Sequence, residues 1–149
     1  MERLYRLFEK HYGCTPVDAV PLTGSASNRQ YFRLTDGTRS CVGVVGTMTE
    51  ENHAFLTMAS HFRSKGLPVP EVYSVSEDGM AYIQEDLGDT ILYNKVCEDF
   101  KTGETEAAED LICRTVSLLP KFQFEGGAGL DYSVCCPESS FSRRTVMFD

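Results

Sequence analysis

The chain has 149 residues, of which 42% are hydrophobic and 24% are charged, enough for one folded domain with a sizeable core. Its formal net charge of −8 argues against a nucleic-acid partner, because a nucleic-acid-binding protein needs a basic face. No stretch approaches the ~20 consecutive apolar residues of a membrane span, and the mixed charges of residues 1–13 are unlike a secretory signal. We therefore expect a cytoplasmic protein with no membrane contact.

The six cysteines are expected to be free thiols. Their number is even, but no C-x-x-C pair occurs, and several lie within apolar or helical patterns. This differs from the disulfide framework of a small secreted domain. The adjacent pair Cys135 and Cys136 is unusual, yet two adjacent cysteines rarely form a metal site alone.

The N-terminal part of the chain predicts a helix followed by three strands. Residues 2–11 place Leu4, Leu7 and Phe8 on one helical face, and Gly13 ends that helix. Strands are expected at residues 17–22, 30–34 and 41–45. With short connections between them, these strands form an antiparallel meander.

A second helix and a second hairpin come next. Residues 50–65 repeat Phe55, Met58 and Phe62 at helical spacing, so these three side chains are expected to be buried against the sheet. Thr47 or Thr49 is expected to cap this helix. Further strands are expected at residues 71–75 and 80–84. All five strands then form one antiparallel sheet, which gives an α+β fold.

After Gly88 the pattern predicts helices only. One begins at Asp89 or Thr90 and continues to about Phe100. A longer helix covers residues 105–119, capped by Thr105. It would bury one apolar face, made by Ala108, Leu111, Ile112, Val116 and Leu119.

Four motifs in this order carry a family resemblance: GSASNRQYFRL (24–34), ENHAFLTMASHFRSKGLPVPEVYSV (51–75), YIQEDLGDT (82–90) and LLPKFQ (118–123). They resemble the aminoglycoside phosphotransferase and choline-kinase group, which has a protein-kinase-like fold. Within that group they look most like bacterial cell-wall amino-sugar kinases, which phosphorylate N-acetylmuramate or N-acetylglucosamine at the anomeric position. The resemblance implies a nucleotide-binding small lobe at residues 1–88. Residues 89–149 would then be the start of a helical large lobe, truncated before its end. The helix at residues 105–119 would lack much of the lobe that should cover it, so an apolar stripe is expected to stay exposed and to favour association.

The resemblance also assigns a role to the loop made by Gly24, Ser25, Ala26, Ser27 and Asn28. In the family the matching loop covers the ATP phosphates, and small uncharged residues let its backbone N–H groups come within hydrogen-bonding range. From the residues alone, an ordinary hairpin turn is the alternative. The loop departs from G-x-G-x-x-G, because it contains a single glycine.

The connector between lobes is the second implied contact with the nucleotide. Gln84, Glu85 and Leu87 would lie at the nucleotide, with the backbone of Glu85 and Leu87 pairing with the adenine edge. An acidic turn before a helix is the alternative interpretation. Three apolar side chains are candidates for sandwiching the base, with core packing as their alternative: Leu22, Tyr31 and Val42.

Glu51 occupies the place where the superfamily holds a glutamate that pairs with a strand lysine. The strand at residues 41–45 contains no lysine, although phosphoryl transfer needs a cation near the phosphates. Arg33 is our candidate substitute, and a surface arginine is the alternative.

The implied activity is ATP-dependent phosphorylation of a sugar or amino-sugar hydroxyl with Mg²⁺, the nucleotide and the sugar being the partners. However, none of the three histidines begins the H-x-D-x-x-x-x-N pattern of the catalytic loop, so no catalytic or metal-binding residue is assigned. We expect that the chain as given does not transfer phosphate. Two alternatives remain: a non-catalytic nucleotide-binding or regulatory half-kinase module, and an α+β domain without a nucleotide site.

Overall fold

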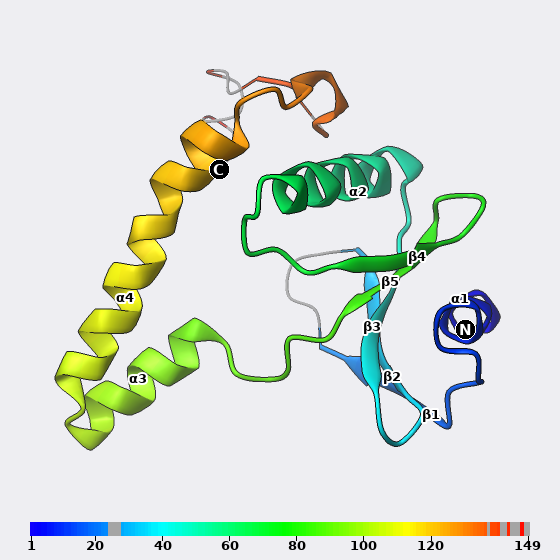
Figure 1. Cartoon of the computed structure of the whole chain (residues 1–149), viewed down its shortest axis with the longest axis horizontal. Coiled ribbons are helices and arrows are strands. Elements are labelled where there is room, and N and C mark those ends of the chain that lie inside the picture. The colour runs from blue at the N-terminus through cyan, green and yellow to red at the C-terminus, as the bar shows by residue number, and fades with distance from the viewer. Residues whose placement is uncertain (24–27, 137, 141–142, 144–146, 148–149) are drawn as a thin grey trace.

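The computed structural model describes the chain except for residues 24–27, 137, 141–142, 144–146 and 148–149. Its main elements are α1 (Glu2–Tyr12), β1 (Asp18–Leu22), β2 (Gln30–Thr35), β3 (Ser40–Val45), α2 (Thr49–Ser64), β4 (Val72–Val75), β5 (Ala81–Glu85), α3 (Leu92–Thr102) and α4 (Thr105–Pro120). A π-helical turn, η1 (Lys121–Gly126), and a 3₁₀ turn, η2 (Tyr132–Val134), follow. Figure 1 shows a sheet between α1 on one side and the α3–α4 arm on the other.

The sheet has five strands in the order β1-β2-β3-β5-β4, and every neighbouring pair is antiparallel. This confirms the α+β fold and the single five-stranded antiparallel sheet expected from the sequence. After β3, the chain passes through α2 to the outer edge of the sheet, where it forms β4. It then returns as β5 between β4 and β3.

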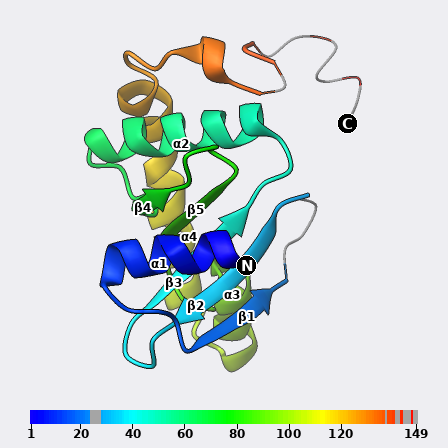
Figure 2. The ribbon, with the colours of Figure 1, turned by 90° about the vertical axis from the view of Figure 1, so that its right-hand side faces the viewer.

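The face of the sheet that packs against α1 holds the larger core. Its fully or nearly fully buried members are Leu4, Leu7, Phe8, Leu34, Cys41, Ala81 and Ile83. Gly43 allows α1 to lie close to β3, because a Cβ atom there would come within 2.9 Å of Leu4 Cδ1. In Figure 2, α1 lies across the strands in front, and α4 lies behind them.

The opposite face packs partly against α2. Val42, Val44 and Tyr82 are buried there, and the ring of Phe55 stacks on Tyr82 with centroids 5.1 Å apart. Phe62 instead meets the ring of Phe122 at 5.4 Å. The expectation that Phe55, Met58 and Phe62 are buried against the sheet was therefore wrong: all three side chains are half-buried, and Phe62 packs on Phe122. The residues of α2 that are fully buried are Asn52, Ala54 and Ala59.

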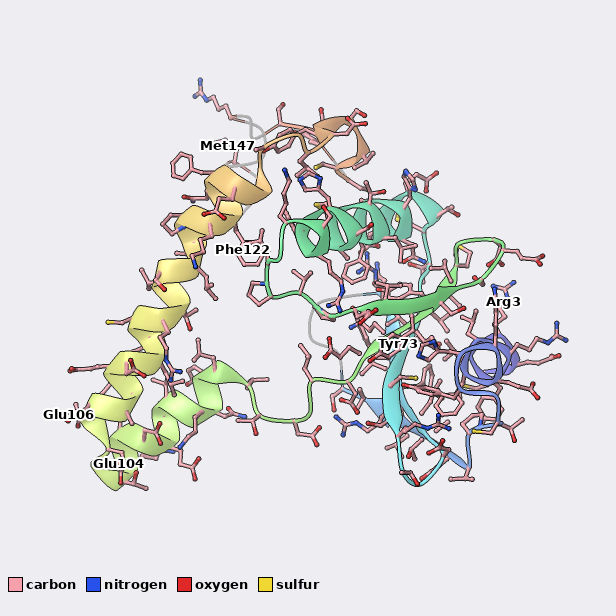
Figure 3. The ribbon with its side chains drawn as sticks, in the orientation of Figure 1. Arg3, Tyr73, Glu104, Glu106, Phe122 and Met147 are labelled. Carbon is pink, nitrogen blue, oxygen red and sulfur yellow. The ribbon has the colours of Figure 1, made fainter. Side chains whose placement is uncertain are left out.

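The α3–α4 arm is joined to the rest of the molecule at both ends. At one end, residues 86–91 lead from β5 into α3. At the other, the Nε2 atom of His61 lies 2.8 Å from the carbonyl oxygen of Gly126. Figure 3 shows Phe122 pointing toward α2 at this junction. Between the two ends, α3 and α4 pack against each other and bury Ala108.

Three helix starts differ from the expectations. The N-cap positions of α2 and α4 are Met48 and Glu104, and neither side chain forms a capping hydrogen bond, so the threonine caps were wrong. α3 begins at Leu92, not at Asp89 or Thr90. The Asp89 carboxylate is bound to Arg33, and Ile91 is extended, which delays the first helical turn.

All six cysteines lie among the described residues, and all are free thiols, as expected. In the part of the chain that the structure describes, no helix is both long and apolar enough to cross a membrane.

Candidate functional site

The sheet face opposite α1 brings together most of the residues singled out from the sequence. Side chains that pair directly across antiparallel strands point to the same face, so the strand register defines two rows. The row nearer the connector contains Val20, Arg33, Val42, Gln84 and Val72. The other row contains Leu22, Tyr31, Val44, Tyr82 and Val75. We call this surface the platform face. It includes all three candidates for the base sandwich.

The loop expected to cover phosphates lies at the end of β1 and β2. Gly24, Ser25, Ala26 and Ser27 fall outside the described residues. Asn28 is described and is exposed to solvent two residues before β2.

Arg29 forms an ion pair with Glu51 that the sequence analysis did not predict. Its Nη2 atom lies 3.1 Å from Glu51 Oε1 and donates to the Glu51 carbonyl oxygen at 3.1 Å. The guanidinium also lies over the ring of Phe55, 5.4 Å from its centroid. The Arg29 side chain is only 12% exposed. Glu51 does pair with a cation, as its place in the family pattern suggests, and that cation is Arg29.

Tyr82 lies beside this ion pair. Burial raises the pKa of the Tyr82 hydroxyl well above its usual range, and the nearby Arg29 acts in the opposite direction. The hydroxyl therefore stays neutral at physiological pH. Arg29, Glu51, Phe55 and Tyr82 together close the α2 end of the platform face. The sequence signal for Arg29 was its place directly after the small-residue loop, next to an expected strand.

Arg33 lies at the other end of the platform face and binds the connector. It holds Asp86 through two bonds, Nε to Oδ2 at 2.7 Å and Nη2 to Oδ1 at 3.0 Å. Its Nη1 atom reaches Asp89 Oδ1 at 2.8 Å. Hydrogen bonds from Arg33, together with those from the Gly88 N–H and the Ser40 hydroxyl, outweigh burial and lower the pKa of Asp86. Arg33 thus forms ion pairs with two carboxylates, and its N–H donors are directed at Asp86 and Asp89.

Some of the polar groups of the connector residues are already used in hydrogen bonds within the protein. The Glu85 N–H donates to the Glu71 carbonyl oxygen at 2.8 Å, so that donor is used within the fold. Leu87 is 68% exposed, and the Gly88 N–H donates to Asp86 Oδ1 at 3.0 Å. Gln84 is half-buried, and its Oε1 atom has no hydrogen-bond partner among the described residues.

A hollow lies at the β4 edge of the platform face, between α2 and β4. Its volume is about 440 Å³, and its walls include Leu56, Ala59 and Val72. Two charged groups at its rim form an ion pair, in which Arg63 Nη2 lies 2.5 Å from Glu71 Oε2. It brings together no set of groups suited to catalysis.

The platform face combines an apolar surface with a cation at each end. Leu22, Tyr31 and Val42 can contact a flat aromatic ring, and the two arginines carry guanidinium groups at opposite ends. Among the described residues, no group of three or more histidine, cysteine, aspartate or glutamate side chains is placed to hold a metal ion. A scan against models of known protein families finds no matching family. A search of curated proteins likewise finds no match.

Proposed function

We propose that this chain binds ATP as the small lobe of a protein-kinase-like phosphotransferase that acts on a sugar or amino-sugar hydroxyl. In this proposal, residues 1–88 form the nucleotide-binding lobe, and residues 89–149 begin the helical lobe. The observation that carries the proposal is the position of the platform face. It lies between Asn28, which is the described residue of the expected phosphate loop, and the connector at Glu85–Leu87, and it carries Tyr31 and Val42.

Each end of this face suits a different part of a nucleotide. The connector contains Leu87, a residue that is 68% exposed, and pairing of its backbone with the adenine edge is part of the proposal, while Gln84 lies in the adjacent row. The apolar middle supports stacking of the base. The opposite end carries Arg29 and Glu51 beside Asn28. A base toward the connector and phosphates toward Arg29 is the orientation that these charges favour.

Mg²⁺ belongs to this proposal only as an ion that ATP brings with it. The described residues present no cluster of metal ligands, so we assign no residue and no step to the ion. The sugar is the proposed acceptor of the complete reaction, again by the family resemblance.

The test is an amide chemical-shift titration of the chain with Mg-ATP. We expect shift changes concentrated at residues 24–28 and 84–87, and a loss of affinity for both ATP and adenosine in Tyr31→Ala. Tyr93→Ala is the matched control, because Tyr93 is a 73% exposed tyrosine on α3, away from the platform face. Shift changes confined to residues 105–149 would contradict the proposal.

A non-catalytic nucleotide-binding module is the second candidate, and the sequence of β3 favours it. The platform positions of that strand are Val42 and Val44, so no strand lysine faces the nucleotide. None of the three histidines begins the catalytic-loop pattern.

We therefore predict binding without phosphoryl transfer. The measurement is product formation from Mg-ATP and amino sugars with the purified chain. Binding alone positions the phosphates, whereas the rate depends on groups that stabilise the developing charge. Turnover above the control without protein, abolished by changing Asp86, Asp89, Asp110 or Asp131, would contradict this prediction.

A further inference from the structure

Two arginines border the platform face, and their surroundings differ in charge. Arg33 is held by both Asp86 and Asp89, so this group of three charges sums to −1. An approaching anion would have to displace a carboxylate from Arg33 and would meet the remaining negative charge. The connector end of the face therefore disfavours a phosphate.

Arg29 is also paired with a carboxylate, but with one instead of two. Its guanidinium is oriented by Glu51 on one side and by the ring of Phe55 on another, and the Arg29–Glu51 pair sums to zero. A guanidinium has five N–H donors in a rigid fork, which matches the oxygens of a phosphate group. Because its side chain is 12% exposed, water screens this charge less than it would screen a surface arginine.

The position of Arg29 on the chain also fits a polyphosphate. Arg29 precedes Tyr31 by two residues, and Arg33 follows Tyr31 by two residues. A ligand that rests on Tyr31 with its uncharged ring toward the connector would extend its charged tail toward Arg29. The rest of the molecule, with a net charge of −8, provides a general repulsion that such a tail must overcome locally.

We infer that Arg29, held in place by Glu51, is the binding group for the phosphate chain of a nucleotide. This inference rests on the proposed function and specifies one part of it. Arg29 acts by donating hydrogen bonds to phosphate oxygens, and Glu51 acts as a positioning residue that fixes the direction of the guanidinium. Arg33 instead holds the connector in place through its ion pairs with Asp86 and Asp89.

The experiment measures binding of ATP, adenosine and inorganic tripolyphosphate to the complete chain by calorimetry. The variants are Arg29→Gln and Arg29→Lys. Arg6→Gln is the matched control, because it removes one positive charge from an exposed position on α1, which covers the other face of the sheet. Circular dichroism melts show whether each variant is folded.

We expect Arg29→Gln to weaken ATP and tripolyphosphate binding by about tenfold to hundredfold, the loss typical of hydrogen bonds to charged groups. Adenosine affinity should change by less than about twofold, because the base does not contact Arg29 in this arrangement. The ATP and tripolyphosphate affinities of Arg29→Lys should fall between those of Arg29→Gln and those of the unmodified chain. Lysine keeps the positive charge but lacks the fork of N–H donors. Arg6→Gln should match the unmodified chain.

The outcomes separate this inference from the proposed function. Binding of ATP with equal affinity in the unmodified chain and in folded Arg29→Gln would overturn the inference and leave the nucleotide site standing. Binding of tripolyphosphate that depends on Arg29, without any adenosine binding, would support the inference and overturn the nucleotide proposal. If Arg29→Gln does not fold, equal tripolyphosphate affinity in Arg29→Lys and the unmodified chain would overturn the requirement for the guanidinium.

Discussion

Arg33 and Asp86 show how a single pair of side chains fixes the start of the connector. The guanidinium binds the Asp86 carboxylate through two nitrogen atoms, and the Asp86 side chain is only 8% exposed. The Ser40 hydroxyl donates to the same carboxylate at 2.8 Å. These bonds join β2, the start of β3 and the first residue after β5, so the connector begins at a defined point relative to the sheet.

Asp86→Asn should destabilise the fold at neutral pH by about 1–3 kcal/mol, because it removes the charge from hydrogen bonds to a mostly buried carboxylate. The pKa of Asp86 is lowered in the folded state, first by Arg33. Its contribution to stability is therefore present above the unfolded pKa of about 3.9 and is lost as the pH falls through the lower folded pKa. Urea unfolding at several pH values should show the variant approaching the unmodified chain as the pH falls.

Asp89→Asn is the control for this prediction. Asp89 binds the same arginine, but its side chain is 79% exposed, so solvent screens the interaction. Losing this ion pair should lower the free energy of unfolding by less than about 1 kcal/mol. Equal losses for the two variants, or a difference between Asp86→Asn and the unmodified chain that does not change with pH, would contradict the assigned role of Asp86.

At the scale of elements, α2 is anchored at its first turn by a buried amide. Asn52 is fully buried, and its Nδ2 atom donates to the Gly79 carbonyl oxygen at 3.0 Å, which ties α2 to the β4–β5 turn. Asn52 has room because residue 46 is glycine. A Cβ atom at Gly46 would lie 2.2 Å from Asn52 Nδ2.

Gly46→Ala should therefore lower the free energy of unfolding by about 1–3 kcal/mol, as overpacking in a core does. Gly43→Ala is the matched control, since its Cβ would meet the flexible ends of Leu4 and Leu34, which can rotate. We expect Gly43→Ala to lower the free energy of unfolding by less than Gly46→Ala does. Adding Asn52→Ala to Gly46→Ala should recover part of the stability, because it removes the steric conflict. Thermal melts that rank Gly43→Ala as the more damaging change would contradict this account.

The sequence predicted the number, order and type of these elements well. Apolar periodicity is a local property, so Leu4, Leu7 and Phe8 were correctly placed on one face of α1, and that face is buried. The starts of α2, α3 and α4 were predicted less well, because they depend on partners distant in the chain. Asp89, for example, was expected to begin a helix, but it binds Arg33, 56 residues earlier in the chain, and α3 begins after it, at Leu92.

The candidate site was predictable in outline and not in its ion pairs. Leu22, Tyr31 and Val42 were singled out through the family resemblance, and they do share one face of the sheet. The arginine that pairs with Glu51 is determined by the sheet register and by the position at which α2 crosses the sheet. The periodicity of the sequence gives no information on either. Arg33 was the expected cation, yet the register places it beside the connector, and Arg29 reaches Glu51 instead.

At the scale of the whole molecule, α4 departs most from the usual rule that apolar faces are covered. One side of α4 meets α3, and Phe122 in the following η1 meets α2. The adjoining side presents Ile112, Val116 and Leu119, which are 39%, 55% and 54% exposed. The spacing of these residues by four and three places them in one stripe along the helix. The sequence predicted this apolar stripe and also that it stays exposed, and the structure confirms both.

An exposed apolar stripe of this kind favours association, because bringing two such surfaces together removes both from water. We predict that the chain forms dimers or larger species through α4, and that the mass measured by sedimentation rises with protein concentration. Val116→Gln combined with Leu119→Gln should lower this association, since glutamine keeps helix propensity while removing apolar surface. Val17→Gln is the control, because Val17 is 74% exposed and precedes β1, away from α4. A chain that stays monomeric at the highest concentration measured, or α4 variants that associate as strongly as Val17→Gln, would show that the stripe does not drive self-association.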